Sequence, residues 1–352
     1  MSTALVSSAD VQREAADGDD RDRKLEHIEL ALDQRTQSEE RYFDQWRFDH
    51  EALPELDLDE IDLSCQFLGK RLAAPILVSC MTGGTADAAA INRNLAEAAE
   101  RAGVAVGVGS QRAAIERPDQ TETFRMREVA PSVPLLGNLG AVQLNYGFGI
   151  NECRRAVEMV GADALAIHLN PLQEALQPEG QCDFRGLTAK IGHLVDELEV
   201  PVVVKEIGCG LTASTARKLR DVGVRYVDTA GVGGTSWARI EAARAGDAPL
   251  GEVFSGWGVP TPLSIRQLVA IDGLTVIGSG GVRSGLDVAK AIALGASVVG
   301  LAQPFLQPAV QGADAVYTKI MRIVRELRIT MFCLGARTLD DLSRTPIHPL
   351  SS

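Results

Sequence analysis

Eight short apolar runs alternate with amphipathic segments, and this alternation constrains the fold more than any other feature of the sequence. The runs occupy residues 75–84, 104–110, 134–140, 164–170, 201–208, 225–231, 274–282 and 297–303. The segments between them show helical periodicity, and several end in glycine, which commonly follows the last turn of a helix. Eight strand–helix units predict a closed parallel (β/α)8 barrel, the TIM barrel, because a doubly wound sheet usually has fewer strands and one early glycine fingerprint.

The composition indicates a globular protein with an acidic surface. The chain has 352 residues, 45% of them hydrophobic, and a formal net charge of −12. This charge disfavours nucleic acid and anionic membranes as partners, so we expect small molecules and further copies of the chain, in a homo-oligomer. The six cysteines show no C-x-x-C spacing, and no secretory signal or transmembrane-length run is present, which predicts free thiols and a cytoplasmic location.

The sequence divides into an acidic tail and one domain. Residues 1–22 are small, polar and acidic, which predicts a disordered tail. Residues 23–352 are predicted to form a single barrel domain that begins with a short N-terminal extension and ends with a helix over 325–342.

Polar or glycine-rich residues follow every predicted strand, and in a TIM barrel the active site is built from these strand ends and the loops after them. The segment GSGGVRSG at 278–285 lets the backbone approach a ligand closely, and the N–H groups of the helix that Ser284 would cap form an anion site. We interpret it as a phosphate cradle, which Ala302 and Gln303 close and to which Thr235 adds a hydroxyl. Glycine-rich turns without a ligand are the alternative interpretation.

Lys205 ends an otherwise apolar run, where a lysine needs an anionic partner. That partner is either a ligand or one of the carboxylates of Glu206 and Asp228 inside the barrel. Three smaller polar residues lie at strand ends, namely Thr82, Ser110 and Asn138. They either bind a ligand or only cap the strand ends through hydrogen bonds to the backbone.

Seven motifs occur in an order that resembles one enzyme family. They are MTGG, GVGSQR, GNLG, HLNPLQEALQPEG, KEIG, GVGGTSW and GSGGVRSG, with RKLEHI upstream. From about residue 23 to the C-terminus the chain resembles the type 2 isopentenyl-diphosphate isomerases, and HLNPLQE together with RK..HI is the specific part of the match. The resemblance implies an FMN-dependent (β/α)8 barrel that interconverts isopentenyl diphosphate and dimethylallyl diphosphate, using reduced flavin and Mg²⁺, with NADPH as the expected reductant.

The resemblance also implies roles for individual residues. The FMN would be held by Met81, Thr82, Gly83, Ser110, Asn138, Lys205, Thr235, Gly281, Val282, Arg283, Ala302 and Gln303. The substrate would be bound by Arg23, Lys24, His27, Arg112, Asn170 and Gln173. The catalytic residues would be Gln173 and His168, and Glu174 would bind Mg²⁺. Ala230 departs from the family, where serine is frequent, so one flavin contact is not expected.

The chemistry of the segment 168–180 suits a magnesium diphosphate. Mg²⁺ takes one or two carboxylates together with phosphate oxygens and waters, so Glu174 alone suffices. His168 and Asn170 alternate along the strand and should point to the same side. Pro171 is expected to end the strand and set a loop that carries Glu174. The alternatives are a core histidine, a solvent-facing carboxylate, and a solvated helix face for the basic cluster around residue 24.

We predict a redox-neutral 1,3-allylic proton shift in which reduced FMN acts as acid and base. Two rival functions stay open. An oxidoreductase of the 2-hydroxy-acid oxidase type needs a histidine base and an arginine in the loop after the sixth strand, where this chain has GVGGTSW. A non-catalytic flavin-binding barrel has no use for Gln173, Glu174 and the basic cluster together.

Overall fold

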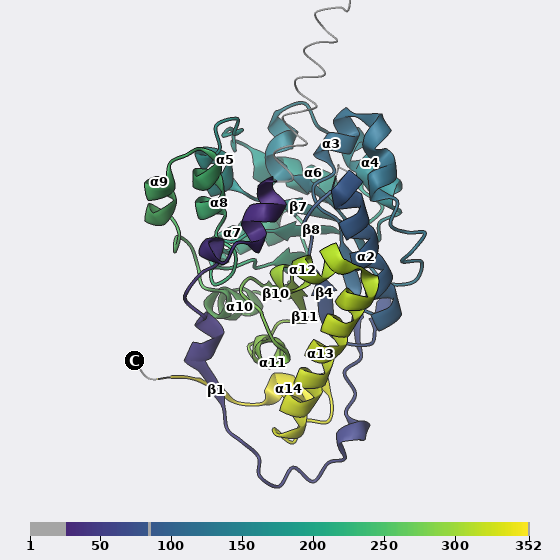
Figure 1. The fold of residues 1–352 in the computed structure, drawn as a ribbon, viewed down its shortest axis with the longest axis vertical. Helices are drawn as coiled ribbons and strands as arrows, with labels where there is room; N and C mark the ends of the chain where they lie inside the picture. The colour runs from purple at the N-terminus through teal and green to yellow at the C-terminus, as the bar shows by residue number, and fades with distance from the viewer. Residues whose placement is uncertain (1–25, 84–85, 351–352) are drawn as a thin grey trace, which may run out of the picture.

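Eight parallel strands close into a barrel in the order β10-β11-β4-β5-β6-β7-β8-β9, so the predicted (β/α)8 fold is confirmed. The structure is a computed structural model that describes residues 26–83 and 86–350 (Figure 1), and the predicted tail 1–22 lies outside them. Each barrel strand falls within one of the predicted apolar runs: β4 Ile76–Val78, β5 Ala105–Gly107, β6 Leu135–Gly140, β7 Ala164–His168, β8 Val202–Lys205, β9 Tyr226–Asp228, β10 Thr275–Ser279 and β11 Val298–Leu301.

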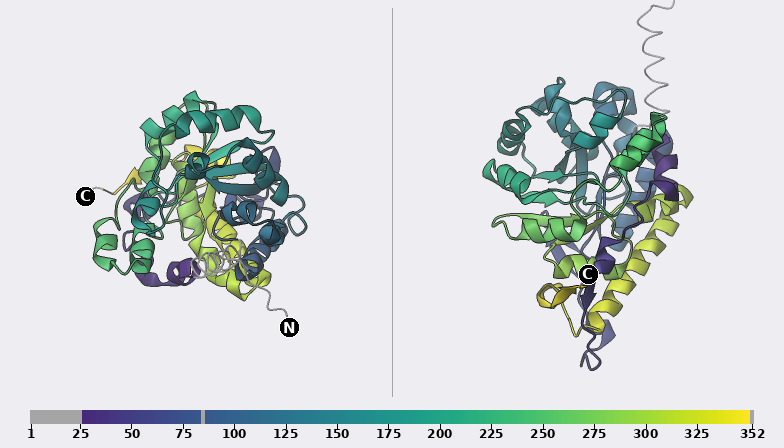
Figure 2. Two further views of the ribbon diagram at one scale, coloured as in Figure 1. Left: turned by 90° about the horizontal axis from the view of Figure 1, so that it is seen from above. Right: turned by 90° about the vertical axis from the view of Figure 1, so that its left-hand side faces the viewer.

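Helices cover the outside of the barrel and bury its apolar outer face (Figure 2). The long helix α13 packs along α2 and α11, as Figure 1 shows. The helix bounds are α2 Ala86–Ala102, α3 Arg112–Glu116, α4 Ile150–Val160, α5 Pro171–Leu176, α6 Leu187–Glu197, α7 Ala213–Asp221, α8 Trp237–Arg244, α9 Ala248–Val253, α10 Thr261–Val269, α11 Gly285–Ala293, α12 Gln303–Gln311, α13 Ala313–Phe332 and α14 Leu339–Arg344. Residues 26–32 are also helical, and short 3-10 helices are η1 Gln34–Thr36, η2 Tyr42–Gln45, η3 Leu58–Glu60, η4 Pro118–Phe124 and η5 Ala141–Asn145.

Four strands lie outside the barrel. The hairpin of β2 (Cys65–Phe67) and β3 (Lys70–Leu72) places Phe67 and Leu72 in one buried cluster with residues at the amino-terminal ends of the barrel strands. The hairpin therefore closes the end of the barrel opposite the predicted site. The other pair joins the two ends of the described chain, because β1 (Trp46–Phe48) pairs antiparallel with β12 (Ile347–Pro349).

The register of the parallel strands brings polar residues to one level at the carboxyl end of the barrel. His168 on β7 pairs with Lys205 on β8, and Lys205 pairs with Asp228 on β9. Gly140 on β6 completes this row on the other side of His168. Side chains at the same level of neighbouring strands can meet, so the barrel itself gathers the polar strand ends that the sequence marks.

Two expectations about local structure are wrong. The segment 325–342 is not one helix: α13 ends at Phe332 and α14 begins at Leu339, with Gly335 between them at φ +66°. A left-handed residue ends a helix, and glycine adopts that conformation without strain. Gln173 and Glu174 lie on the short helix α5 rather than in a loop, because Pro171 occupies its first turn, where the missing N–H costs nothing.

Two expectations drawn from composition can be compared with the structure. All six cysteines are free thiols, as predicted. Within the described ranges, the structure contains no helix with the length and apolar character needed to span a membrane.

Candidate active site

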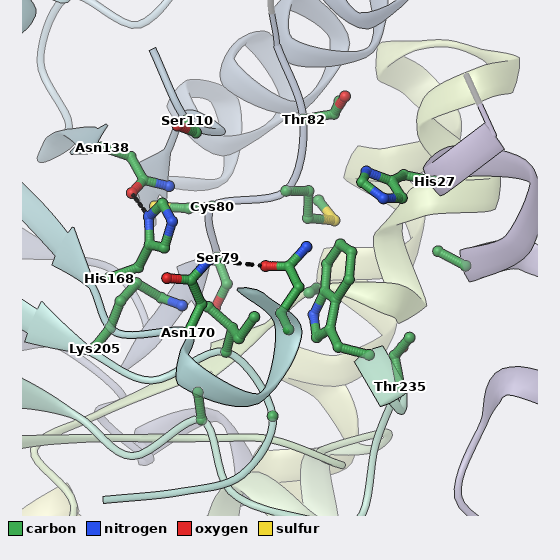
Figure 3. Close-up of a pocket in the computed structure, with 18 of the residues that line it drawn as sticks. His27, Ser79, Cys80, Thr82, Ser110, Asn138, His168, Asn170, Lys205 and Thr235 are labelled. Atoms are coloured by element: carbon green, nitrogen blue, oxygen red, sulfur yellow. Dashed lines mark hydrogen bonds between the residues drawn. The ribbon is translucent and has the colours of Figure 1, made fainter. Parts of the chain in front are cut away.

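A cavity of about 630 Å³ opens at the carboxyl ends of the barrel strands (Figure 3). Its size is in the range of cofactor and ligand sites in proteins. Every predicted site residue that the structure describes lines it: His27, Met81, Thr82, Gly83, Ser110, Arg112, Asn138, His168, Asn170, Gln173, Glu174, Lys205, Thr235, Gly281, Val282, Arg283, Ala302 and Gln303. Arg23 and Lys24 lie outside the described residues. The structure thus brings the predicted residues together, and their individual roles stay predictions.

His168 faces this cavity from the end of β7 and is neutral. Its Nδ1 lies 2.9 Å from Oδ1 of Asn138, whose Nδ2 donates to the Val108 carbonyl oxygen at 3.3 Å (Figure 3). Since that Asn138 oxygen can only accept, Nδ1 of His168 carries the proton and Nε2 is left as an acceptor. Burial, with the neighbouring charge of Lys205, lowers the pKa of His168 to about 3. The histidine therefore presents a neutral ring at ordinary pH.

This depressed pKa predicts how stability depends on pH. The unfolded chain binds a proton at His168 below its ordinary pKa of about 6.5, whereas the folded chain binds it only near pH 3. Lowering the pH from 6.5 toward 3 therefore favours the unfolded state, by roughly 2 to 3 kcal/mol at pH 4.5. We expect His168→Gln to lose less stability than wild type between pH 7 and pH 4.5, because it lacks the titrating ring. The free energy of unfolding in urea at the two pH values measures this. An identical pH dependence in both proteins would contradict a neutral His168.

Lys205 lies at the bottom of the cavity without a carboxylate partner. It is 8% exposed, and Nζ donates to the Glu206 carbonyl oxygen at 2.6 Å. Among the described residues no ion pair joins Lys205 to Glu206 or Asp228, so neither of the pairs considered from the sequence forms. The Glu206 carboxylate instead accepts from the amides of residues 207–210. Burial raises the pKa of both Glu206 and Asp228, and the nearby charge of Lys205 opposes that rise. An ammonium group has three donors, so Lys205 can also donate to an anionic ligand.

Two glycine-rich loops form one wall of the cavity. A Cβ on Gly234 would lie 2.8 Å from the amide nitrogen of Gly281, so the two loops can approach this closely only because glycine occupies both places. Ser284 caps α11 as predicted, but the amides of Arg283 and Ser284 donate to Asp287 Oδ2 at 2.9 and 3.0 Å. Part of the predicted anion site is therefore already satisfied by Asp287. Any phosphate here would face the loop rather than those two amides.

Gln37, from the N-terminal extension, contacts this cradle and was not predicted. Its Oε1 accepts from Arg283 Nη2 at 2.7 Å and from Thr235 Oγ1 at 3.1 Å. Arg283 also donates to Gln303 Oε1 at 3.1 Å. Gln37 is 7% exposed, and its own carbonyl oxygen accepts from Arg239 at 2.9 Å. The extension is thereby joined to the loops that would hold a phosphate.

Another part of the cavity lining carries a chain of hydrogen-bonded polar side chains. Asn170 Nδ2 donates to Glu174 Oε1 at 2.7 Å and to Gln173 Oε1 at 3.1 Å. Gln173 Nε2 donates to Glu241 Oε1 at 2.7 Å. Glu174 is 6% exposed, and its Oε2 also accepts from the Gln181 amide at 2.6 Å. Both ends of the Gln173 amide and both oxygens of Glu174 are therefore held in place.

Glu241, at the end of this chain, is a fully buried carboxylate that the sequence did not identify. Its Oε1 lies 3.1 Å from Nε2 of His27, and its Oε2 lies 2.7 Å from Nη1 of Arg244. Burial would raise the pKa of Glu241, but His27, Gln173 and Arg244 together outweigh burial and hold this pKa below its ordinary value. His27 also packs edge-on against Trp237, with ring centroids 5.2 Å apart. The helix at 26–32 is thus fixed to the cavity wall.

Three buried polar atoms of cavity-lining residues have no hydrogen-bond partner within the described chain: His27 Nε2, Ser79 Oγ and Asn170 Oδ1. His27 Nε2 lies within ion-pair distance of Glu241. Buried polar atoms are nearly always satisfied, so the Ser79 and Asn170 oxygens indicate a polar ligand. Of the cations at the rim, Arg112 pairs with Glu116 at 3.0 Å. No group of three or more metal-ligating side chains occurs among residues 26–83 and 86–350, so Glu174 is a single carboxylate and not part of a metal cluster.

Similar proteins support the interpretation of this cavity. The chain matches the sequence profile of the FMN-dependent dehydrogenase family over residues 27–124 and 179–349. An isopentenyl-diphosphate delta-isomerase from Nostoc sp. is 47% identical over 329 residues, covering 92% of this chain and 94% of that protein. One from Methanothrix thermoacetophila is 48% identical over 332 residues (92% of each chain), and one from Synechococcus sp. is 50% identical over 317 residues (88% and 91%).

Solved structures of flavin-family oxidases share the fold at low identity. A mandelate oxidase variant with (S)-mandelic acid superimposes with a TM-score of 0.66 at 20% identity, covering 99% of this chain and all of that one (100%). The lactate oxidase of Pediococcus acidilactici gives 0.64 at 17% identity, covering 88% and 85%. At this identity the likeness concerns the fold alone. The high identity to the isomerases is decisive, and the chain belongs to the type 2 isopentenyl-diphosphate delta-isomerases, within the FMN-dependent dehydrogenase family.

Proposed function

We propose that this enzyme interconverts isopentenyl diphosphate and dimethylallyl diphosphate by a 1,3-allylic proton shift, with reduced FMN and Mg²⁺ in the barrel-mouth cavity. One observation carries the proposal. The same cavity gathers two sets of groups: a buried lysine with a glycine-rich cradle, and the buried Glu174 carboxylate next to a fixed glutamine amide. The first set suits an anionic flavin nucleotide, and the second suits a magnesium diphosphate with an apolar carbon chain.

The residues present fit FMN. The phosphate would lie against Thr235, Arg283 and the loop at Gly281, where the described hydrogen bonds include none donated by the Gly281 and Val282 amides. The ring would lie over Lys205, near the unpartnered Ser79 hydroxyl. When bound and reduced, FMN supplies the acid and base for the proton shift. We propose NADPH as its reductant, while a homo-oligomeric state and a cytoplasmic location stay predictions of the sequence.

The residues present also fit Mg²⁺ that arrives with the diphosphate. Glu174 is a buried carboxylate that lines the cavity, and its two oxygens accept from Asn170, Gln177 and the Gln181 amide. These bonds hold the carboxylate in one orientation and leave it an open lone pair. Mg²⁺ commonly takes one protein carboxylate with phosphate oxygens and waters, so no resident cluster of ligands is required.

The chain itself supplies orientation rather than a titrating acid. Gln173 is neutral at every ordinary pH, and its amide is fixed at both ends by Asn170 and Glu241. His168 is neutral and offers an acceptor nitrogen to the cavity. Lys205 provides positive charge, which would stabilise an anionic ring beside the cationic carbon that forms when the alkene is protonated.

The rival function is net oxidation of a 2-hydroxy acid. It has to be considered because the mandelate and lactate oxidases share this fold. Residues 229–237 after β9 read TAGVGGTSW and contain neither a histidine base nor an arginine. Product analysis by HPLC tests the choice. An isomerase converts isopentenyl diphosphate to dimethylallyl diphosphate without oxygen uptake, whereas an oxidase consumes oxygen with a hydroxy acid and leaves the diphosphate unchanged.

The basic cluster ahead of the described residues gives a further prediction. If Arg23 and Lys24 clamp the diphosphate together with His27, the double variant Arg23→Ala plus Lys24→Ala should raise KM strongly, because each charge-assisted contact contributes about 1.5 to 3 kcal/mol. kcat should change little. Deleting residues 2–20 is the control, since it removes acidic charge and should leave KM unchanged or lower. A wild-type KM in the double variant would identify the cluster as a solvated helix face.

A further inference from the structure

Arg244 joins three carboxylates from three segments of the cavity wall. It ends α8, and its side chain is 11% exposed. Its guanidinium lies 2.7 Å from Glu241 on the same helix, 3.1 Å from Glu26 on the N-terminal helical segment, and 3.3 Å from Glu179 after α5. Glu241 is fully buried, whereas the side chains of Glu26 and Glu179 are 55% and 40% exposed. The ion pair with Glu241 is therefore buried, whereas the ion pairs with Glu26 and Glu179 are partly exposed to solvent.

We propose that Arg244 is a positioning residue for the isomerase reaction, which it serves by holding the Glu241 carboxylate in the orientation that fixes the amide of Gln173. This inference rests on the proposed function, because it concerns the glutamine next to the reacting carbons. Arg244 does not line the cavity. It acts on Gln173 only through Glu241.

The hydrogen bonds show why the Gln173 amide depends on an ionised Glu241. Gln173 Nε2 donates to Glu241 Oε1 at 2.7 Å, and Gln173 Oε1 accepts from Asn170 at 3.1 Å. A carboxylate can only accept, so it selects one of the two ways in which an amide can face it. A protonated Glu241 could donate to Gln173 Oε1, and the amide would then turn over. The charge on Glu241 therefore decides whether the nitrogen or the oxygen of the Gln173 amide faces Glu241, and so fixes the orientation of the whole amide.

Arg244 is the partner that keeps this charge in place. A buried carboxylate without a cation is costly and takes up a proton instead. Within residues 26–83 and 86–350, the other partners of Glu241 are the neutral Gln173 amide and His27, whose ring is charged only when protonated. An arginine stays charged at all ordinary pH values and reaches Glu241 Oε2, the oxygen that Gln173 does not use. Removing it would leave the carboxylate without a permanent counter-charge.

The two outer ion pairs provide matched controls. Glu26 and Glu179 meet the same guanidinium, but they are more than one-third exposed and such pairs contribute little. If Arg244 served mainly to hold the three segments together, removing its ion pairs with Glu26 and Glu179 would lower kcat as much as removing Arg244 itself. If it acts through Glu241, then Glu26→Gln plus Glu179→Gln should leave kcat within about threefold of wild type.

The experiment measures kcat, KM and FMN affinity for Arg244→Gln, Arg244→Lys, Glu241→Gln and the Arg244→Gln/Glu241→Gln pair. Misplacing a group by about 1 Å can cost a hundredfold in rate, so we expect Arg244→Gln to lower kcat about a hundredfold, with KM for isopentenyl diphosphate and FMN affinity near wild type. Lysine should restore much of kcat because it returns the charge. The double variant should be no slower than Glu241→Gln alone, since a residue that acts only through Glu241 adds nothing once that carboxylate is neutral.

Three outcomes would overturn the inference. The first is a loss of kcat in Arg244→Gln/Glu241→Gln that equals the product of the losses in the two single variants. The second is a loss of kcat in Glu26→Gln plus Glu179→Gln that equals the loss in Arg244→Gln. The third is a wild-type kcat in Arg244→Gln. If Arg244→Gln does not fold, the lysine variant and the neutral double variant carry the same comparison, because neither leaves a lone buried charge. An inactive wild-type enzyme would overturn the proposed function and this inference with it, whereas an active wild type beside an unaffected Arg244→Gln overturns the inference alone.

Discussion

Glu174→Gln is expected to raise the Mg²⁺ concentration at half-maximal activity about tenfold to a hundredfold, which corresponds to the loss of one charge-assisted contact. The substitution keeps the shape of the side chain and removes its charge. The new side chain can turn its oxygen toward the Asn170 amide, so Asn170 keeps its hydrogen bond to Gln173. The NH2 group of the new side chain then replaces the oxygen that accepted from Gln177 and from the Gln181 amide. We therefore expect a folded protein whose metal response alone is strongly altered, measured by titrating Mg²⁺ into the isomerase assay.

The controls separate a metal ligand from a cofactor ligand. FMN affinity should stay near wild type in Glu174→Gln, because the hydrogen bonds of this carboxylate are to Asn170, Gln177 and Gln181 and not to the glycine-rich loops. Glu179→Gln removes a carboxylate that is largely exposed and should leave the Mg²⁺ response unchanged. If Glu174→Gln lost flavin and kept its Mg²⁺ response, the residue would belong to the cofactor site instead.

Lys205→Met is expected to lower kcat by about 10²- to 10³-fold, the cost of removing one preorganised group that stabilises developing charge. Lys205 is buried, and a single carbonyl contact at 2.6 Å holds its ammonium group under the proposed ring position. Methionine fills the same volume without the charge. The reduced ring should then be less stable relative to the oxidised ring, so the midpoint potential of bound FMN should fall. Anaerobic spectroelectrochemistry measures that potential on the holoenzyme.

Lys190→Met, at an exposed lysine outside the cavity, is the control for this substitution. Lys190 lies on α6, its ammonium group also donates to a single backbone carbonyl, that of Leu144, and it does not line the cavity. It should change neither kcat nor the potential. An unchanged potential in Lys205→Met would place the lysine away from the flavin, and the proposed orientation of the cofactor would be wrong.

The sequence predicts the barrel well because each strand is short, apolar and followed by its own polar residues. β6 and β7 illustrate this, since both lie inside the predicted runs and each carries a residue that lines the cavity, Asn138 and His168. Alternation along a strand also places His168 and Asn170 correctly on the cavity side. Such strands and their polar ends can be predicted because the pattern involves only residues that are neighbours in the sequence.

The missing parts depend on contacts between distant residues. Gln37 meets Arg283 and Thr235 across more than 190 positions in the chain, and nothing near it in the sequence indicates a site. Glu241 lies in an ordinary helical stretch, and only the packing of α5 and α8 turns it toward Gln173. Asp287 is a different case, because its hydrogen bonds to the amides of Arg283 and Ser284 join residues only four and three positions apart and form a local helix cap.

The central claim is that reduced FMN in this cavity isomerises isopentenyl diphosphate without net oxidation. The direct measurement is an anaerobic assay with Mg²⁺ that follows the flavin spectrum and dimethylallyl diphosphate together, starting from oxidised or reduced FMN. We predict many turnovers per flavin while the spectrum stays that of reduced FMN, and only background product with oxidised FMN. Equal rates with oxidised FMN, or one product per flavin with reoxidation of the ring, would contradict the claim.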